Sequence, residues 1–282
     1  MGKIVFVAFI AIICSLANIK GQNMMSHSCT GNDSEQYGVC VIKDGKKIGT
    51  MIDKAFAMHS VMKFPQALYV AEYLKTHSMS LKDSILIRKN ELKQDTWSPM
   101  LNAFEGERYF SYAELLRLSL GQSDNNACDI LFKYIGNPRQ VEMYIHELGY
   151  NGINIKLTER EMAKNPALSF VNSSTPLDMA GLFLWLFNHK DDSEYLSFIW
   201  KTMKNCKTGA ERISASIPKS AIFVHKTGTG FTYPDNTKDR NDAGIIVMPD
   251  GTYMAIVVFI SHSKTEHELA RVAESCIGKF EE

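Results

Sequence analysis

The spacing of hydrophobic residues changes along the chain and divides it into three parts. Near the start, the apolar run Tyr37–Ile42 leads into Lys43–Lys46, a turn-forming sequence that predicts a strand entering a hairpin. From about Ser60 to Lys201, apolar residues recur every three or four positions, which is typical of amphipathic helices. The clearest helical stretches are 67–74, 112–120, 127–135 and 177–187.

The last third returns to strand patterns. Ala221–His225, Gly244–Met248 and Tyr253–Ile260 are runs rich in apolar residues, and Pro249–Gly251 between the last two predicts an antiparallel hairpin. The chain then closes with an amphipathic stretch, Lys264–Phe280, whose apolar side we expect to pack on the sheet as a helix.

This order of elements predicts an α+β fold of the α/β sandwich type. Both chain ends contribute strands to a mostly antiparallel sheet flanked by helices, and a helical domain is inserted between them. We place the α/β domain at 37–57 and 202–282, and an all-α domain at 58–201.

The N-terminus has the pattern of a secretory signal peptide. Lys3 precedes an apolar run, Ile4–Ala17, after which the chain turns polar. Crossing a bilayer takes about 20 apolar residues, so this run is short for a membrane anchor. Residues 1–17 are therefore expected to be removed, which predicts an exported protein, periplasmic or secreted, with no membrane attachment in its mature form.

Composition adds little beyond a soluble globular class. The 282 residues include 31 Lys+Arg and 31 Asp+Glu, so the net charge is zero. That balance gives no support for binding to nucleic acid or to anionic membranes.

The cysteines predict no metal or redox site. Without the signal, five remain, and none of them forms a CxxC pair: Cys29, Cys40, Cys128, Cys206 and Cys276. Cys29 and Cys40 lie close enough in sequence to pair in an oxidising compartment. The odd number leaves at least one thiol unpaired within the chain.

Three short polar motifs carry the candidate chemistry, in the order Ser60–Lys63, Ser123–Asn125 and Lys226–Gly228. Each is weak alone, because Ser-x-x-Lys recurs at Ser216 and Ser261. Lys-Thr-Gly likewise recurs at 207–209. Helix capping is an alternative explanation for the first two motifs, since Ser, Asp and Asn are preferred N-caps.

Context selects Ser60 among the three candidate serines. Ser60 precedes a long amphipathic pattern, so Ser60 and Lys63 would share one helix face, where the amine reaches the hydroxyl. A desolvated lysine at that place can act as a base. By contrast, Ser216 is followed by Pro218, and Ser261 ends a strand.

Context also selects Lys226. It follows an apolar run, so the Lys-Thr-Gly sequence lies at the end of a strand or continues it. Gly228 and Gly230 would then let a substrate backbone lie close to that strand.

With these motifs in this order, the chain resembles the class A serine β-lactamases over essentially all of its mature length. Trp97–Pro99 looks like the family's site-entrance loop, and Thr158–Met162 resembles part of its omega loop, here about 155–176. Arg212 stands where some members have an arginine for the substrate carboxylate. The match is most similar to subclass A2, whose members are mainly cephalosporinases.

The resemblance implies a fold with a five-stranded sheet, a β-lactam substrate, no cofactor, no metal and a monomeric state. Ser60 would be acylated, with Lys63 or Glu159 as base, and Glu159 would activate the water that releases the acyl group. The N–H groups of Ser60 and Thr229 would form the oxyanion hole. Ser123, supported by Lys226, would protonate the leaving nitrogen. The substrate would contact Trp97, Asn125, Thr227, Gly228, Thr229 and Arg212.

The chain departs from the family pattern inside the omega-type loop. Arg160 replaces the proline that usually follows the glutamate, and we predict a trans bond there because a cis bond to a non-proline residue costs about 2.5–4 kcal/mol. Ala163 stands where an asparagine usually helps to hold the water, and Glu161 competes with Glu159 as the base. The preceding segment, 22–36, reads as loop rather than as the family's opening helix.

Two other functions use the same serine. A penicillin-binding D,D-carboxypeptidase and a β-lactam-binding sensor domain would both become acylated and then fail to hydrolyse the β-lactam adduct. Glu159 in a loop of the expected kind favours the β-lactamase.

Overall fold

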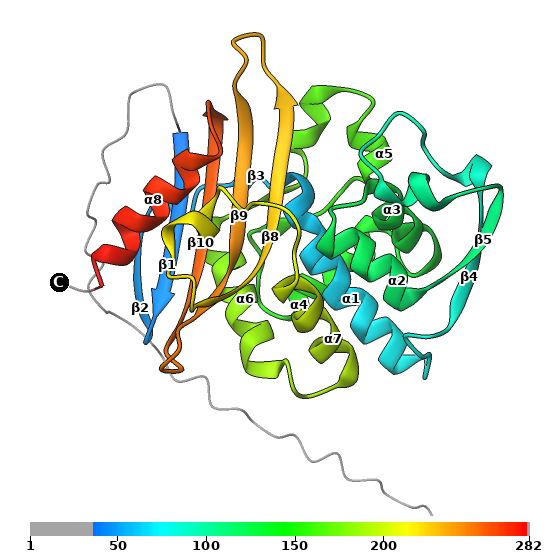
Figure 1. Ribbon diagram of the computed structural model, residues 1–282, viewed down its shortest axis with the longest axis horizontal. Coiled ribbons are helices and arrows are strands. Elements are labelled where there is room, and N and C mark those ends of the chain that lie inside the picture. Colours follow the sequence, from blue (N-terminus) through cyan, green and yellow to red (C-terminus); the bar gives the residue numbers. More distant parts are fainter. Residues whose placement is uncertain (1–35, 281–282) are drawn as a thin grey trace, which may run out of the picture.

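A five-stranded antiparallel sheet separates a C-terminal helix from a larger helical body in the computed structural model, which describes residues 36–280 (Figure 1). The strands follow the order β2-β1-β10-β9-β8 across the sheet. Their bounds are β1 Gln36–Lys43, β2 Lys46–Thr50, β8 Ile222–Thr232, β9 Lys238–Val247 and β10 Tyr253–Ser263. The expected α+β fold with a five-stranded sheet is confirmed.

Both faces of the sheet are buried, because apolar side chains of its strands alternate between two cores. In β1, Val39 and Val41 pack in the core beneath α8 (His267–Gly278), whereas Cys40 and Ile42 belong to the core shared with the helical body. The two-residue period therefore makes the sheet the middle layer.

The two predicted hairpins are confirmed. Lys43 pairs with Lys46, and Asp44 and Gly45 between them have φ angles of 50° and 75°, as a two-residue turn between antiparallel strands requires. Val247 pairs with Tyr253 across the second turn.

The predicted helical stretches are found, with one change at 112–120. There α2 (Tyr112–Leu116) passes into a π-helical turn, Arg117–Gly121. The other α-helices of the body are α1 Lys63–Thr76, α3 Asn125–Tyr134, α4 Pro138–Glu147, α5 Glu159–Met162, α6 Pro176–His189 and α7 Glu194–Lys204. None of the helices within residues 36–280 is long and apolar enough to cross a bilayer.

The description of 58–201 as all-α is wrong in one respect. The segment contains an antiparallel ribbon of β4 (Ser84–Arg88) and β5 (Glu107–Ser111). A smaller sheet joins β3 (Phe56–Ala57), β7 (Ser173–Ser174) and β6 (Ile153–Asn154). The sequence did not predict the ribbon because β5 is mostly polar and exposed, which weakens the two-residue alternation of apolar and polar side chains. The division into two domains stays a prediction.

Some expectations concern residues outside the described part of the chain. The signal peptide and most of the 22–36 segment lie there, as does Cys29 of the expected Cys29–Cys40 pair. Cys40 itself is buried in β1, and the pair stays a prediction because its other member lies outside the described residues.

Candidate active site

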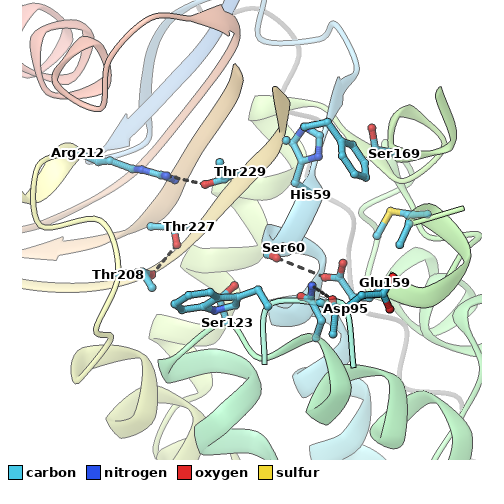
Figure 2. Close-up of a pocket in the computed structure, with 17 residues that line it drawn as sticks. His59, Ser60, Asp95, Ser123, Glu159, Ser169, Thr208, Arg212, Thr227 and Thr229 are labelled. Atoms are coloured by element: carbon cyan, nitrogen blue, oxygen red, sulfur yellow. Dashed lines mark hydrogen bonds between the residues drawn. The ribbon is translucent and has the colours of Figure 1, made fainter. Parts of the chain in front are cut away.

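A cleft of about 510 Å³ lies between the edge strand β8 and the helical body, and most of the predicted site residues line it. Figure 2 shows Thr227, Thr229 and Arg212 on one side of Ser60 and Glu159 on the other. The predicted residues in its wall are Ser60, Trp97, Ser123, Asn125, Glu159, Arg212, Thr227 and Thr229. The other predicted residues, Lys63, Lys226 and Gly228, are buried behind the wall.

Ser60 is held by a 3₁₀ turn, His59–Met62, that runs directly into α1. Its Oγ accepts a hydrogen bond from Nζ of Lys63 at 2.7 Å, as the spacing predicted. The capping alternative for Ser60 is wrong, because Met58 and Met62 occupy the N-cap positions. Ser60 is thus free of a structural role at the helix start, with its hydroxyl exposed to the cleft.

Lys63 connects the three polar groups on the floor of the cleft. Besides Ser60, its fully buried ammonium donates to Oδ1 of Asn125 at 2.9 Å and to Oε1 of Glu159. The Glu159 carboxylate supplies the counter-charge that a buried ammonium needs. Ser60 Oγ also donates to the same Glu159 oxygen at 3.3 Å.

Glu159 is oriented by Asp129, a residue that the sequence analysis missed. The N–H groups of Glu159 and Arg160 donate to the two carboxylate oxygens of Asp129 at 2.8 and 3.0 Å. Burial and the nearby charge of Glu159 raise the pKa of Asp129 to about 7. The Glu159–Arg160 bond is trans, which confirms the prediction.

Glu161 does not reach the cleft. Its Oε2 accepts hydrogen bonds from the backbone N–H and the hydroxyl of Thr158, both at 2.9 Å, in a capping box at the start of α5. These hydrogen bonds hold the pKa of Glu161 below its usual value. Of the two competing carboxylates, only Glu159 contacts Ser60 and Lys63.

The residues of the second motif have different roles: Asp124 stabilises a helix, and Ser123 belongs to the candidate site. Asp124 is the N-cap of α3 and accepts from the N–H of Ala127 at 2.9 Å and the hydroxyl of Ser98 at 2.8 Å. Capping therefore explains Asp124 alone. Ser123 has a left-handed φ of 59°, and its Oγ accepts from Nζ of Lys226 at 2.9 Å.

Trp97 stands at the mouth of the cleft. Its indole N–H donates to the carbonyl of Gln122 at 3.0 Å, and its carbonyl accepts from the N–H of Asn125 at 3.0 Å. The residue is 62% exposed and lines the cleft, so it is accessible to a ligand there. Asn125 also donates from Nδ2 to the hydroxyl of Thr96 at 2.9 Å, which leaves its amide fixed at both ends.

Lys226 lies inside β8, which continues through the third motif to Thr232. Burial, and after it the charge of Lys63, lower the pKa of Lys226 to about 7. Its ammonium donates to Ser123 and, at 2.8 Å, to the carbonyl of Thr227.

The reason for the two glycines in β8 differs from the expectation. A Cβ on Gly228 would lie 2.5 Å from the carbonyl oxygen of Met58, and one on Gly230 would lie 2.8 Å from the ring of His59. The space beside these glycines is thus filled by Met58 and His59, which lead into the turn that carries Ser60. It is not open for a substrate backbone.

Arg212 reaches β8 from the loop after α7. Its Nη1 donates to the carbonyls of Gly228 at 2.8 Å and Asn241 at 2.7 Å, and its Nη2 donates to Oγ1 of Thr229 at 2.7 Å. Glu266 accepts from Nε and pairs with the charge. Arg212 therefore supports the end of β8 as well as facing the cleft.

His59 is a second lining residue that the sequence did not reveal. It has a φ of 47°, and its Nε2 lies 3.0 Å from Oδ2 of Asp239 on β9. In the sequence, only its position before Ser60 pointed to the site. Its contact with Asp239 could not be predicted, because the two residues are far apart along the chain. The structure also adds Asp95, Thr96, Met162, Ala163, Ser169, Thr208, Gly230 and Phe231 to the wall. Within residues 36–280, no cluster of His, Cys, Asp and Glu side chains could hold a metal ion.

The chain matches known proteins over most of its length. A family model described as the β-lactamase enzyme family matches residues 22–279. The chain is 31% identical to β-lactamase VEB-1 of Pseudomonas aeruginosa over 96% of its own length and 93% of that protein. A crystal structure of a β-lactamase from Chitinophaga pinensis superposes with a TM-score of 0.82 at 34% identity, covering 88% of this chain and 94% of that one.

The fold extends beyond the β-lactamases. The structure of a protein named PBP-A, 20% identical, superposes with a TM-score of 0.76 over 89% of this chain and 92% of that chain. At that identity the likeness concerns the fold alone. Family membership therefore rests on the family model and the closer relatives, in agreement with the geometry around Ser60: this chain belongs to the class A β-lactamases, hydrolases that open the β-lactam amide.

Proposed function

We propose that this protein hydrolyses β-lactams through an acyl-enzyme on Ser60. The observation that carries the proposal is the contact of one hydroxyl, Ser60 Oγ, with both Lys63 and Glu159. A serine hydroxyl is a weak nucleophile unless a neighbouring base takes its proton, and these two groups are within reach.

For acylation, the Ser60 proton passes to Glu159, directly or through Lys63. In the direct route, Glu159 Oε1 accepts the proton along the 3.3 Å contact. In the other route, Lys63 first gives a proton to Glu159 and then accepts the one from Ser60. Both routes leave the serine oxygen bonded to the lactam carbonyl carbon and the proton on Glu159.

The tetrahedral intermediate is stabilised by the N–H groups of Ser60 and Thr229, which both belong to the cleft wall. Each such donor is worth about 2.7–4 kcal/mol of barrier. When the C–N bond breaks, Ser123 gives its proton to the lactam nitrogen, and the proton held on Glu159 passes by way of Lys63 to replace it, so Glu159 is again a free carboxylate. The hydrogen bond from Lys226 to Ser123 supports this role because it holds Oγ in place.

Substrate groups are held from both sides of the cleft. Asn125 binds the amide of the acyl side chain, and the exposed ring of Trp97 covers it. Thr227, Thr229 and Arg212 hold the carboxylate, beside the backbone of Gly228. Arg212 acts mainly through Thr229, since its own donors are already taken by β8.

Glu159 then removes a proton from the water that attacks the ester. As the ester C–O bond breaks, Glu159 gives that proton to the leaving Ser60 oxygen, and the free enzyme is restored. This step separates hydrolysis from the lasting β-lactam acylation of a D,D-carboxypeptidase or a sensor. Ala163 lines the cleft near this step and offers the water no polar side chain, so Glu159 and Ser60 must orient it.

We further propose an exported monomer with a preference for cephalosporins. Export is supported by Lys3 and the apolar run Ile4–Ala17. The cephalosporin preference is supported by the Thr-Glu-x-x-Met form of the loop at 158–162 together with Arg212, the pattern that resembles subclass A2.

The test is turnover of a chromogenic cephalosporin by the purified protein, compared with benzylpenicillin. Many turnovers per enzyme and a higher kcat/KM for the cephalosporin are expected. A single stoichiometric burst would contradict hydrolysis, and a higher kcat/KM for the penicillin would contradict the preference.

A further inference from the structure

The Lys-Thr-Gly sequence at 207–209, which the proposed reaction does not use, packs against the Lys-Thr-Gly sequence of β8. Oγ1 of Thr208 lies 2.6 Å from Oγ1 of Thr227. Both threonines line the cleft, on the side that also carries Thr229 and Arg212 (Figure 2). The sequence at 207–209 thus adds a hydroxyl to the part of the cleft where the substrate carboxylate is proposed to bind.

The residues on both sides of Thr208 fix the place of its hydroxyl. The N–H of Lys207 donates to the carbonyl of Gly121 at 2.8 Å, which attaches the loop to the helical body. Gly209 has a φ of 81°, and a Cβ there would lie 2.6 Å from Cγ2 of Thr227. Glycine at 209 therefore lets the loop come this close to β8.

The two hydroxyls hold two protons, and only one of these protons lies between the oxygens. The other close neighbour of Thr208 Oγ1 is Sγ of Cys206 at 3.3 Å, and sulfur is a weak acceptor. Among residues 36–280, no second group hydrogen-bonds Oγ1 of Thr227. When Thr208 donates to Thr227, the Thr227 proton is therefore free to point into the cleft.

The cations near this hydroxyl pair already use most of their donors. Lys226 is fully buried, and its ammonium donates to Ser123 and to the carbonyl of Thr227. Arg212 donates to Thr229 and to two carbonyls of the sheet. Their charges attract an anion, but a carboxylate in the cleft also needs hydroxyl donors. The direction of the Thr227 proton therefore decides how well the carboxylate is held.

We propose that Thr208 is a positioning residue for the substrate carboxylate, an inference that rests on the proposed function. Its hydroxyl donates to Oγ1 of Thr227, and the Thr227 hydroxyl donates to the carboxylate. The two hydrogen bonds strengthen each other, because a hydroxyl that accepts a hydrogen bond becomes a better donor. Thr208 thus acts on the substrate through Thr227.

The primary test is equilibrium binding to the full chain carrying Ser60→Ala, which removes the nucleophile. A cephalosporin is compared by ligand-observed NMR with its descarboxy analogue, in which hydrogen replaces the carboxylate. Thr208→Val removes the hydroxyl and keeps the shape, so it should raise the Kd of the cephalosporin by about three- to ten-fold, the range of one neutral hydrogen bond. The Kd of the analogue should stay the same, and Thr208→Ser should restore the Kd of the cephalosporin.

The proposal is overturned by an unchanged Kd for the cephalosporin, by an equal rise for both ligands, or by a Thr208→Ser variant as weak as Thr208→Val. It is also overturned if the cephalosporin does not bind measurably to Ser60→Ala. Thr208→Ala takes the place of the valine variant if that variant does not fold. Absence of turnover in the protein with Ser60 intact is instead a failure of the proposed function, because the Kd values are measured without chemistry.

A double-mutant comparison tests whether Thr208 acts through Thr227. In the same Ser60→Ala background, Thr227→Val should raise the Kd of the cephalosporin at least as much as Thr208→Val does. Adding Thr208→Val to Thr227→Val should then change the Kd little, because the hydroxyl that Thr208 orients is gone. A further rise equal to that of Thr208→Val alone would show that Thr208 acts independently and would overturn its positioning role.

Discussion

Nζ of Lys226 donates to Oγ of Ser123 across 2.9 Å, and this bond joins the edge strand of the sheet to the helical body over the cleft. Burial and the charge of Lys63 bring the pKa of Lys226 down to about 7. The buried amine that holds Ser123 and lies behind Thr227 thus changes its charge near neutrality.

This titration predicts an alkaline limb in the pH profile. As the pH rises through about 7, free Lys226 loses its charge, so kcat/KM for an anionic β-lactam should fall. Lys226→Arg keeps its charge at all working pH values and should shift that limb upward. Identical alkaline limbs in the two enzymes would show that another group causes the decline.

Arg212→Ala should affect both binding and stability. The variant removes the charge-assisted hydrogen bond that positions Thr229 and a cation near the substrate carboxylate, and KM should rise by about ten-fold, since such a bond is worth about 1.5 kcal/mol or more. It also leaves the carbonyls of Gly228 and Asn241 without their donor, which should cost about 1–3 kcal/mol of unfolding free energy.

Steady-state kinetics and urea unfolding measure the two effects separately. Glu266→Gln is the matched control, because it removes the charge opposite Arg212 but keeps the arginine. It should lower stability with a smaller rise in KM. An unchanged KM in Arg212→Ala would remove Arg212 from substrate binding.

Asp129 predicts a pH dependence of stability. Its folded pKa, about 7, lies above the ordinary aspartate value, so the folded state holds the proton more tightly than the unfolded chain. The stability that this group contributes is full below about pH 4 and is lost as the pH rises through about 7. Asp129→Asn cannot titrate, so its unfolding free energy should lack this slope. Parallel stability profiles for the two proteins would contradict the assignment.

Ala163→Asn should speed deacylation. The side chain at 163 lines the cleft, and an amide there would give the attacking water a polar partner. Single-turnover release of the acyl group should rise by up to about ten-fold. Slower release would show that the water occupies another place, and Ala163→Val serves as the control for added bulk without polarity.

Local contacts of the site could be predicted from the sequence. Ser60 and Lys63 are three residues apart, so helical geometry alone brings the amine to the hydroxyl. The hairpins at 43–46 and 249–251 were predictable for the same reason, because turn residues act over a few positions.

Contacts between distant segments could not be predicted. The packing of Gly228 and Gly230 on the turn at Met58 and His59 depends on how the sheet meets the helical body, and no local pattern encodes it. The hydrogen bond from the Glu159 N–H to Asp129 also joins α3 to the start of α5, which only the fold brings together. The β4–β5 ribbon was not predicted because the polar, exposed residues of β5 mask the strand period.

The role of Glu159 is tested most directly by the intact mass of Glu159→Gln mixed with a cephalosporin. Lys63 still contacts Ser60 in this variant and, once its proton is lost to solvent, can accept the Ser60 proton, so acylation should continue at a lower rate. The adduct should map to Ser60 and persist, since deacylation should slow more, by about 10²–10⁴-fold. Glu161→Gln, the matched control in the same loop, should turn over as the wild type does. A persistent adduct in Glu161→Gln and rapid turnover in Glu159→Gln would contradict the account.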